Sequence, residues 1–369
     1  MRITGVTWQW FRLPVRRFSS AAGALTERIG AIVRLTTDTG IVGIGEAAPL
    51  PDRQTDTMAE INEDLKRMAD SLAGYELNSA QSLDELPEAS AAVSCAVETA
   101  GLDALGRVQG VSVASLLAPA IRDSVAVNAV IAEPDARLAG EAARAALQAG
   151  FACIKLKVGM ERTIESECAR VALVRESLGP EVLLRLDANG AWSPGQAIRI
   201  IRSLAQYQLD LVEQPIAPGD PKDMAAVRSA VNVPIAADED VTDEAAALRL
   251  VEANAVDCLV VKLVVVGGPR AAMRIAEIAK KARISTIVTT SIESGVGVTA
   301  ALHVAAAVPG QLLHCGLATG SFLAADLVVQ PIEVEGGYMR IPKKPGLGIE
   351  LDEAAVTRHE IPQEGRSDA

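Results

Sequence analysis

The sequence has few of the residues on which several large classes of binding protein depend. Of its 369 residues only 3% are aromatic and three are histidine, which gives little support for a platform that stacks bases or sugars. Lys and Arg total 35 against 47 Asp and Glu, so the formal net charge is −12. That acidic balance argues against binding of nucleic acid or anionic membranes. We expect neither as a partner.

Cysteine usage and the absence of common motifs exclude further classes. The five cysteines are odd in number and scattered, and neither CxxC nor HExxH occurs, so no disulfide framework or zinc site is predicted. No GxGxxG follows a first strand, which weakens a dinucleotide-binding interpretation. The longest stretch without a charged residue, 294–325, is interrupted by Pro309, glycines and two histidines. The N-terminus has no signal-peptide core, and we expect a cytoplasmic protein with free thiols.

Residues 1–120 have the pattern of an α+β domain. Residues 2–13 alternate in hydrophobicity like a strand, and residues 29–47 predict a hairpin that turns at Asp38–Gly40. Residues 56–118 then place their apolar side chains at helical spacing. Strands followed by a run of helices are typical of this class.

Residues 121–330 change to an alternation of short apolar runs with Ala-rich amphipathic helices. Eight runs alternate with helices, which predicts an α/β fold, a TIM-type (β/α)8 barrel with its parallel strands buried on both faces. These runs are 125–132, 153–158, 182–189, 209–215, 233–240, 257–263, 284–292 and 311–318. The strand-like, turn-rich segment 331–369 is expected to pack back on the first domain, with its last few residues disordered.

Charged residues recur at one position in these apolar runs, the carboxyl end. The three acids and the last lysine of the set follow one another at steps of 24–26 residues, about one βα unit each. In a TIM barrel that end of the strands carries the active site. The set consists of Lys155, Lys157, Asp187, Glu213, Asp238 and Lys262.

Three carboxylates from adjacent strand ends would repel one another strongly without a cation. Three hard oxygen ligands, with room for water and substrate, favour Mg²⁺, with Mn²⁺ as a substitute, over Zn²⁺. Because strand side chains alternate, Lys155 and Lys157 point to the same side. Their strand precedes the strands of the acids in the cyclic order and the strand of Lys262 follows them, so the lysines flank the acids. This arrangement suits removal of a proton α to a carboxylate, with the metal stabilising the enediolate.

Other interpretations remain open from the residues alone. A single Lys or Asp at a strand end is usually a solvated loop residue, although the regular spacing of the whole set argues against that. A barrel lysine can also form a Schiff base with a carbonyl substrate, but a Schiff-base lyase does not explain three aligned acids. A barrel that only binds a ligand is the third alternative.

At these residues the sequence resembles the enolase superfamily, in its muconate-lactonizing-enzyme-like subgroup. The resemblance covers the whole chain and implies a modified (β/α)7β barrel with an N-terminal capping domain. The motifs that carry it are KLK at 155–157, DANGAW at 187–192, EQP at 213–215, ADED at 237–240, VVKL at 260–263, SIESGVG at 291–297 and KPGLG at 344–348. The resemblance also implies the mechanism of that superfamily, in which a Lys or His base removes the proton and Mg²⁺ stabilises the enediolate.

The resemblance further implies roles for individual residues. Asp187, Glu213 and Asp238 would hold Mg²⁺, and Lys157 and Lys262 would face the substrate from opposite sides. Two capping loops, near 18–22 and 48–55, would close over the site. The resemblance implies that Lys155 supports Lys157 or the substrate carboxylate, and that Asn189 and Glu239 lie beside the ligands. Glu293 is expected in the same outer shell, either as a hydrogen-bond partner of a catalytic lysine or the substrate or in a structural role at the seventh strand end. The expected substrate contacts are Ser20, Gly316 and Thr319.

The subgroup contains several reactions. Dipeptide epimerases usually carry an Asp-x-Asp pair after the eighth strand, and cycloisomerases tend to have a glutamate there, whereas this sequence has GLATGSFL at 316–323. That neutral segment resembles some o-succinylbenzoate synthases, dehydratases of menaquinone biosynthesis. N-acylamino acid racemases and dipeptide epimerases are the alternative, followed by muconate-type cycloisomerases. We also expect a small carboxylate substrate, a homo-oligomer and packed roles for His303 and His314.

Overall fold

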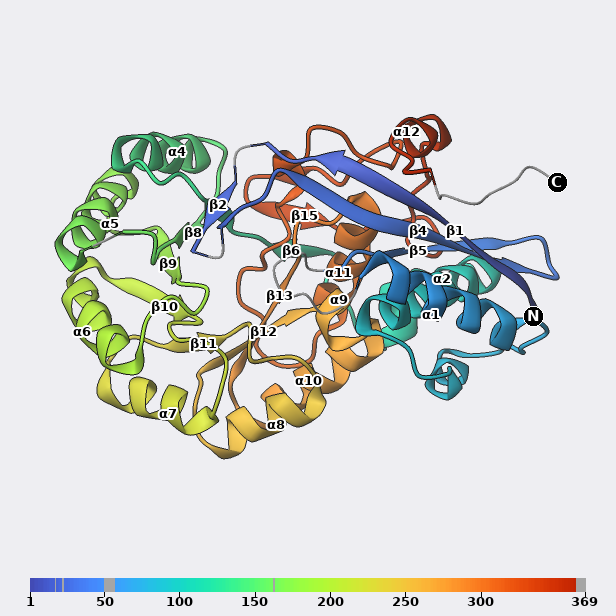
Figure 1. The fold of residues 1–369 in the computed structure, drawn as a ribbon, viewed down its shortest axis with the longest axis horizontal. Helices are drawn as coiled ribbons and strands as arrows, with labels where there is room; N and C mark the ends of the chain where they lie inside the picture. Colours follow the sequence, from blue (N-terminus) through green and yellow to red (C-terminus); the bar gives the residue numbers. More distant parts are fainter. Residues whose placement is uncertain (17, 22, 50–56, 162, 363–369) are drawn as a thin grey trace.

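The computed structural model describes residues 1–16, 18–21, 23–49, 57–161 and 163–362. In Figure 1, a curved sheet with helices along its outer side lies beside a smaller unit built from the first part of the chain. Both units share one large hydrophobic core, to which Phe11, Leu102, Leu186 and Leu302 contribute as fully buried side chains.

The smaller unit is a three-stranded antiparallel sheet covered by helices. Its strands are β1 (Ile3–Pro14), β4 (Glu27–Thr37) and β5 (Val42–Ala47), in the order β1-β4-β5. Its helices are α1 (Met58–Leu72), η2 (Ala80–Glu85), α2 (Ala91–Gln109) and α3 (Val113–Leu117). The predicted hairpin at 38–40 and the helical region are confirmed. A Cβ on Gly43 or Gly45 would lie 2.0 Å from a carbonyl oxygen of α2, so glycine allows the helix to pack closely on β5.

The curved sheet is parallel and has seven strands, in the order β13-β12-β11-β10-β9-β8-β7. The strands are β7 (Ala129–Ile131), β8 (Cys153–Lys157), β9 (Leu183–Asp187), β10 (Leu209–Glu213), β11 (Ile235–Ala237), β12 (Cys258–Lys262) and β13 (Ser285–Thr289). The helices are α4 (Ala136–Gln148), α5 (Ile164–Leu178), α6 (Pro194–Leu204), η3 (Ala205–Tyr207), α7 (Pro221–Ala230), α8 (Glu244–Glu252), α9 (Leu263–Val266), α10 (Pro269–Ala282) and α11 (Gly295–Ala307).

The eighth predicted strand is not a regular strand. Residues 311–318 instead make isolated parallel bridges, Leu312 and Gly316 with β13 and Cys315 with Val127 on the other side. Backbone hydrogen bonds from this segment to both neighbours join the two edges of the sheet, so the barrel is closed by an irregular segment. The first predicted run is likewise divided, because residues 124–126 form β6 in a different sheet.

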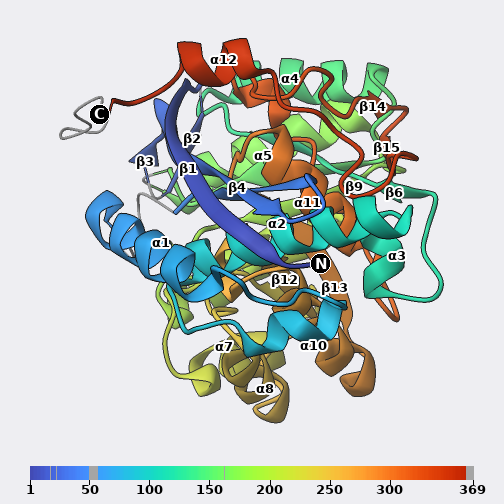
Figure 2. The same cartoon turned by 90° about the vertical axis from the view of Figure 1, so that its right-hand side faces the viewer.

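The C-terminal segment returns to the first unit. After η4 (Gly320–Phe322), which still belongs to the barrel segment, it contains β14 (Val334–Glu335), β15 (Tyr338–Arg340) and α12 (Glu353–Arg358), and β15 pairs with β6 (Ser124–Ala126). Figure 2 shows α12 near the end of β1. The Ile361 amide donates to the Trp10 carbonyl oxygen at 2.9 Å, and Arg34 pairs with Glu353 at 2.7 Å. The expected disorder of the last residues lies outside the described residues.

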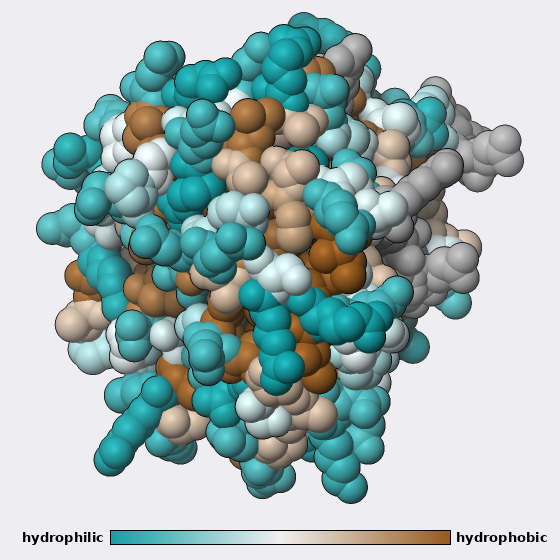
Figure 3. All heavy atoms as spheres, turned by 90° about the vertical axis from the view of Figure 1, so that its left-hand side faces the viewer, coloured by the Kyte–Doolittle hydropathy of each residue, from teal (hydrophilic) through white to brown (hydrophobic). Residues whose placement is uncertain are grey.

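The outer helices present a hydrophilic surface. Figure 3 shows the face formed by the left-hand side of Figure 1, where hydrophilic side chains cover much of the surface and apolar atoms are exposed in small areas between them. This pattern is typical of helices that bury one face against a sheet. Among the described residues, no helix is long and apolar enough to span a membrane.

Candidate active site

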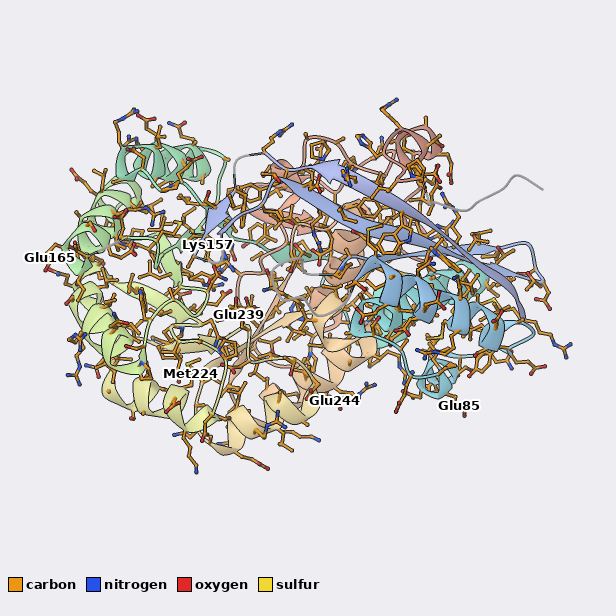
Figure 4. All side chains as sticks on the ribbon, in the orientation of Figure 1. Glu85, Lys157, Glu165, Met224, Glu239 and Glu244 are labelled. Atoms are coloured by element: carbon orange, nitrogen blue, oxygen red, sulfur yellow. The ribbon has the colours of Figure 1, made fainter. Side chains whose placement is uncertain are left out.

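The strand ends bring the predicted charged residues to one height of the barrel. In the parallel register, Lys157 of β8 lies opposite Asp187 of β9, which in turn lies opposite Glu213 of β10. Asp238 directly follows β11, and Lys262 ends β12. Figure 4 shows Lys157 and Glu239 inside the ring of helices, whereas Glu165 and Glu244 lie on its outer side.

Each predicted lysine pairs with a predicted acid. Lys155 Nζ lies 2.9 Å from Glu213 Oε1 and 3.2 Å from Asp187 Oδ2. Lys157 Nζ lies 2.7 Å from Asp187 Oδ2, and Lys262 Nζ lies 2.6 Å from Asp238 Oδ2. The lysines therefore neutralise the acids from both flanks, as the order of the strands predicts.

Burial and mutual repulsion shift the pKa values of the acids in different directions. Burial opposes ionisation of Asp187, but the ammonium groups of Lys157 and Lys155 outweigh it and hold the pKa of Asp187 well below its usual range. Burial and the nearby Asp187 charge raise the pKa of Glu213 to about 8, although Lys155 opposes the shift. Asp187 and Glu213 therefore respond in opposite directions, because the ammonium groups outweigh burial at Asp187 whereas burial and the Asp187 charge outweigh Lys155 at Glu213.

The donor chemistry of these residues fits a hard divalent cation. Asp238 Oδ1 is buried and has no hydrogen-bond partner among the described residues. Within that part of the chain, however, no three Asp, Glu, His or Cys side chains lie together as a ready set of ligands. Lys155 lies between Asp187 and Glu213 instead, and its ammonium contacts one oxygen of each carboxylate. Carboxylate oxygens from adjacent strand ends are nevertheless the ligands that Mg²⁺ prefers.

Two residues with left-handed backbone conformation support the acids. Asn189 (φ 44°) accepts from Lys157 Nζ at 2.9 Å and donates to Glu239 Oε1 at 3.0 Å. Gln214 (φ 39°) is fully buried, and its side-chain oxygen accepts from the Asp238 amide at 2.9 Å. Sequence reasoning assigned no role to Gln214, although it is the middle residue of the EQP motif. Its contact fixes the backbone that carries Asp238.

A cavity of about 330 Å³ opens beside these residues. Its lining includes the predicted substrate contacts Ser20, Gly316 and Thr319. The other lining residues are Phe18, Gly23, Ala24, Leu25, Val130, Lys155, Lys157, Asp187, Asn189, Asp238, Glu239, Lys262, Thr289, Thr290, Ser291, Ile292 and Phe322. The structure therefore brings almost all of the predicted site together. Glu213 is not among the described lining residues, but it pairs with Lys155, which is.

The cavity has a neutral side, which we define as the lining contributed by residues 289–292 and 316–322, where no lining side chain is charged. On the neutral side, the hydroxyl groups of Thr290 and Thr319 lie 2.8 Å apart. A Cβ on Gly316 would lie 2.2 Å from Thr289 Oγ1, so only glycine fits there. The lining residues Phe18 and Phe322 stack edge to face with ring centroids 5.1 Å apart.

The small hairpin of β2 (Ser19–Ser20) and β3 (Gly23–Ala24), together with the flanking Phe18 and Leu25, supplies the part of the lining that comes from the first unit. The Phe18 ring lies next to it, with its centroid 5.9 Å from Lys157 Nζ. This matches the first expected capping loop, apart from residue 22. Most of the second, residues 50–55, lies outside the described residues.

Glu293 lies apart from this cavity. It lines a smaller, separate cavity with Glu46 and Cys95, behind the wall formed by Thr289 and Thr290. Burial raises its pKa, and the charge of Arg28 opposes the shift. Its carboxylate accepts from the Ser291 amide. The structure thus places Glu293 behind the site, in contact with the turn that follows β13.

The two histidines of the barrel lie outside the described lining of the active-site cavity. His303 is fully buried, with Nε2 3.0 Å from the Leu347 carbonyl oxygen, and burial lowers its pKa to about 4. Its predicted packed role is confirmed. The carbonyl oxygen of His314 accepts from Arg185 Nη1 at 2.7 Å.

Comparison with known proteins decides the family. A profile described as "Enolase C-terminal domain-like" matches residues 137–355, and one described as "Mandelate racemase / muconate lactonizing enzyme, N-terminal domain" matches residues 4–118. The chain belongs to the enolase superfamily, in its muconate-lactonizing-enzyme-like subgroup. The expected TIM-type barrel with an N-terminal α+β unit is confirmed, and this enolase-superfamily chain is an enzyme.

Individual relatives of this enolase-superfamily chain carry different activities. It is 32% identical to a hydrophobic dipeptide epimerase of Enterococcus faecalis over 92% of this chain and 93% of that protein. It is 40% identical to an o-succinylbenzoate synthase of Thermobifida fusca, over 65% of this chain and 72% of that one. A muconate lactonizing enzyme from Pseudomonas fluorescens, solved with muconolactone, superposes with a TM-score of 0.92 at 26% identity, covering 98% and 99% of the two chains.

Proposed function

We propose that the protein is a Mg²⁺-dependent enzyme that removes a proton α to a carboxylate, and that its reaction is the dehydration catalysed by o-succinylbenzoate synthase in menaquinone biosynthesis. The 40% identity to a synthase supports this choice, although that match covers 65% of the chain. Enzymes of the family are generally Mg²⁺-dependent.

Three acids would hold the ion and the lysines would handle the proton. Asp187, Glu213 and Asp238 are the proposed ligands, and a bound divalent cation would supply positive charge that stabilises charge developing on the substrate carboxylate. Lys157 would take the α-proton and return a proton to the hydroxyl that leaves from the same face. Lys262, on the opposite flank, would stabilise the enediolate through its ammonium group.

The observation that carries the choice of reaction is the neutral side of the cavity. Among the described lining residues, the only carboxylates are Asp187, Asp238 and Glu239, which lie at the carboxyl ends of β9 and β11 and not on the neutral side. Thr289, Thr290 and Gly316 belong to the neutral side, on which Thr289 lies next to Lys262 in the strand register. An unpaired ammonium group there would lose its hydration without a counter-charge, so the neutral side disfavours a free amino group. The neutral side suits a substrate whose far end, away from the reacting carboxylate, is neutral or binds to hydroxyl and amide groups.

A second candidate is a racemase of N-acylamino acids or an epimerase of dipeptides. The observation that favours it is the placement of Lys157 and Lys262 on opposite flanks of the acids, since racemisation needs a proton donor and a proton acceptor on the two faces. The epimerase relative also matches over most of the chain. An N-acyl group would remove the amino charge that the neutral side disfavours. Muconate-type cycloisomerisation is a more distant alternative.

The test uses the purified protein with Mg²⁺ and the hydroxylated precursor of o-succinylbenzoate, followed by ultraviolet absorbance as the aromatic product forms. We expect turnover that is lost in Lys157→Ala and retained in Lys222→Ala, a lysine on the outer helix α7. If the protein does not dehydrate this precursor but inverts N-acylamino acids, it is a racemase and not a synthase.

The remaining expectations are also proposals. We propose domain limits at residues 1–120, 121–330 and 331–369, with the first domain acting as a cap. Asn189 and Glu239 would support the metal ligands, and Ser20, Gly316 and Thr319 would contact the substrate. A cytoplasmic location and a homo-oligomer complete the proposal, and size-exclusion chromatography with light scattering would test for the oligomer.

A further inference from the structure

One wall of the active-site cavity contains an unusual turn. Ser291 and Ile292 line the cavity between β13 and α11, and Ile292 has φ 63°. A β-branched residue in the left-handed region is a genuine outlier, because its Cβ crowds the backbone. The Ile292 side chain is 4% exposed, so it is packed and not a surface feature. Such a conformation persists only when its surroundings hold it.

The residue that holds the first part of this turn comes from the capping unit. Arg28 of β4 is fully buried, and its Nε donates to the Ser291 carbonyl oxygen at 2.9 Å. Its two other nitrogens donate to the carbonyl oxygens of Ala48 at 2.6 Å and Pro49 at 2.5 Å. One planar guanidinium therefore ties the turn to the segment that follows β5. A lysine ammonium cannot reproduce this fork of three directed donors.

The neighbouring strand of the same unit holds the other side of the turn. Glu46 of β5 accepts from the amide of Ser294 at 3.1 Å, from its hydroxyl at 2.6 Å and from the amide of Gly297 at 2.9 Å. These groups belong to the start of α11, next to Glu293, whose carboxylate folds back to the Ser291 amide. Ile292 therefore lies between Ser291 and Ser294, whose backbone groups are hydrogen-bonded to Arg28 and Glu46 of the capping unit.

We propose that Arg28 is a positioning residue of the active site, which holds the strained turn at Ile292 and so fixes the cavity wall from the capping unit. Arg28 is not among the described lining residues of the cavity, so it acts through the turn. The sequence separation between Arg28 and Ser291 is 263 residues, and the contact couples docking of the cap to the shape of the site. The kinetic part of this inference rests on the proposed function, whereas its structural part does not.

The kinetic test is a double-mutant cycle of Arg28→Met and Ile292→Gly. Glycine adopts the left-handed conformation without strain, so the turn no longer needs Arg28 to hold it. We expect Arg28→Met to lower kcat/KM about 100-fold, as a displaced wall can. In the Ile292→Gly background the same change should cost at least about fivefold less. Equal losses in both backgrounds would overturn the proposal, since a merely structural Arg28 gives additive effects.

The matched control is Arg34→Met on the same strand. Arg34 pairs with Glu353 at the surface, away from the cavity lining, and its loss should leave kcat/KM within about twofold. Arg28→Lys keeps the charge and serves as a second variant at this position in case Arg28→Met does not fold. We expect it to fold and to restore only part of the activity. Full activity in Arg28→Lys would contradict the need for the three directed contacts.

A second readout does not depend on any substrate. Hydrogen exchange of the segment 290–297 should be faster in Arg28→Met than in the unaltered protein, with the segment 300–307 of α11 unchanged. Unchanged exchange in both segments would overturn the inference. If the unaltered protein shows no turnover on either substrate class, the proposed function fails while this experiment still decides the role of Arg28.

Discussion

Two buried glutamates of the capping unit should make the stability of the protein depend on pH. Glu46 binds the start of α11, and Glu98 of α2 accepts from the Arg270 amide at the start of α10, at 2.5 Å. Burial is the main cause that raises the pKa of each to about 7, from 4.5. Glu293 adds repulsion at Glu46, and Arg270 partly opposes the shift at Glu98.

The sign follows from proton linkage. A carboxyl group with a raised pKa in the folded state favours the protonated, folded form, so its contribution is fully present below pH 4.5 and is lost as pH rises through 7. A shift from 4.5 to about 7 corresponds to about 3 kcal/mol for each glutamate at 1.36 kcal/mol per pH unit. Most of that loss falls between about pH 5 and pH 8.

Glu46→Gln removes one of the two titrating groups, and urea unfolding at pH 5 and pH 8 measures the consequence. The unaltered protein should lose about 2–3 kcal/mol more unfolding free energy between these pH values than Glu46→Gln does. Glu98→Gln should reduce the dependence of the unfolding free energy on pH by a similar amount. The control is Glu63→Gln, since Glu63 makes a surface pair with Lys66 and its loss should leave the slope unchanged. Parallel pH profiles for Glu46→Gln and the unaltered protein would show that Glu46 does not titrate with folding.

Three further predictions concern the active site. Glu213→Gln should reduce turnover at least about 1,000-fold while circular dichroism stays unchanged, and wild-type activity would show that Glu213 is no ligand. Chelation with EDTA should abolish turnover and Mg²⁺ or Mn²⁺ should restore it, whereas borohydride trapping of the substrate would instead indicate a Schiff base. Phe322→Ala should raise KM about 10-fold by removing one ring of the aromatic pair, and an unchanged KM would place the substrate elsewhere.

The charged residues of the site were predictable because their pattern is local and repetitive. Each lies at the end of one apolar run, and the parallel barrel converts equal sequence spacing into equal height. The alternation of strand side chains also predicts that Lys155 and Lys157 share one side. Both predictions needed only the period of a strand and the geometry of one fold.

Other features depend on contacts that no local pattern encodes. The run 311–318 looks like a strand because it is apolar, yet it forms only isolated bridges to its two neighbours. Glu46 lies in the predicted hairpin 29–47, and Arg28 lies just before it in a stretch expected to be a loop, although it belongs to β4. Their partners Ser291 and Ser294 are 263 and 248 residues away. Gln214 was missed for a similar reason, since its partner, the Asp238 amide, belongs to the next strand end.

Deuterium exchange followed by NMR is the measurement that bears most directly on metal-assisted removal of a proton α to a carboxylate. The protein is incubated in D₂O with Mg²⁺, once with the o-succinylbenzoate precursor and once with N-acylamino acids. We expect one of two reactions, either replacement of the α-proton by deuterium or loss of the α-proton together with the hydroxyl group as water. Either reaction should require Lys157 and should stop when EDTA is added. Equal exchange or dehydration in Lys157→Ala or in EDTA would contradict proton removal by Lys157 at a metal-bound carboxylate.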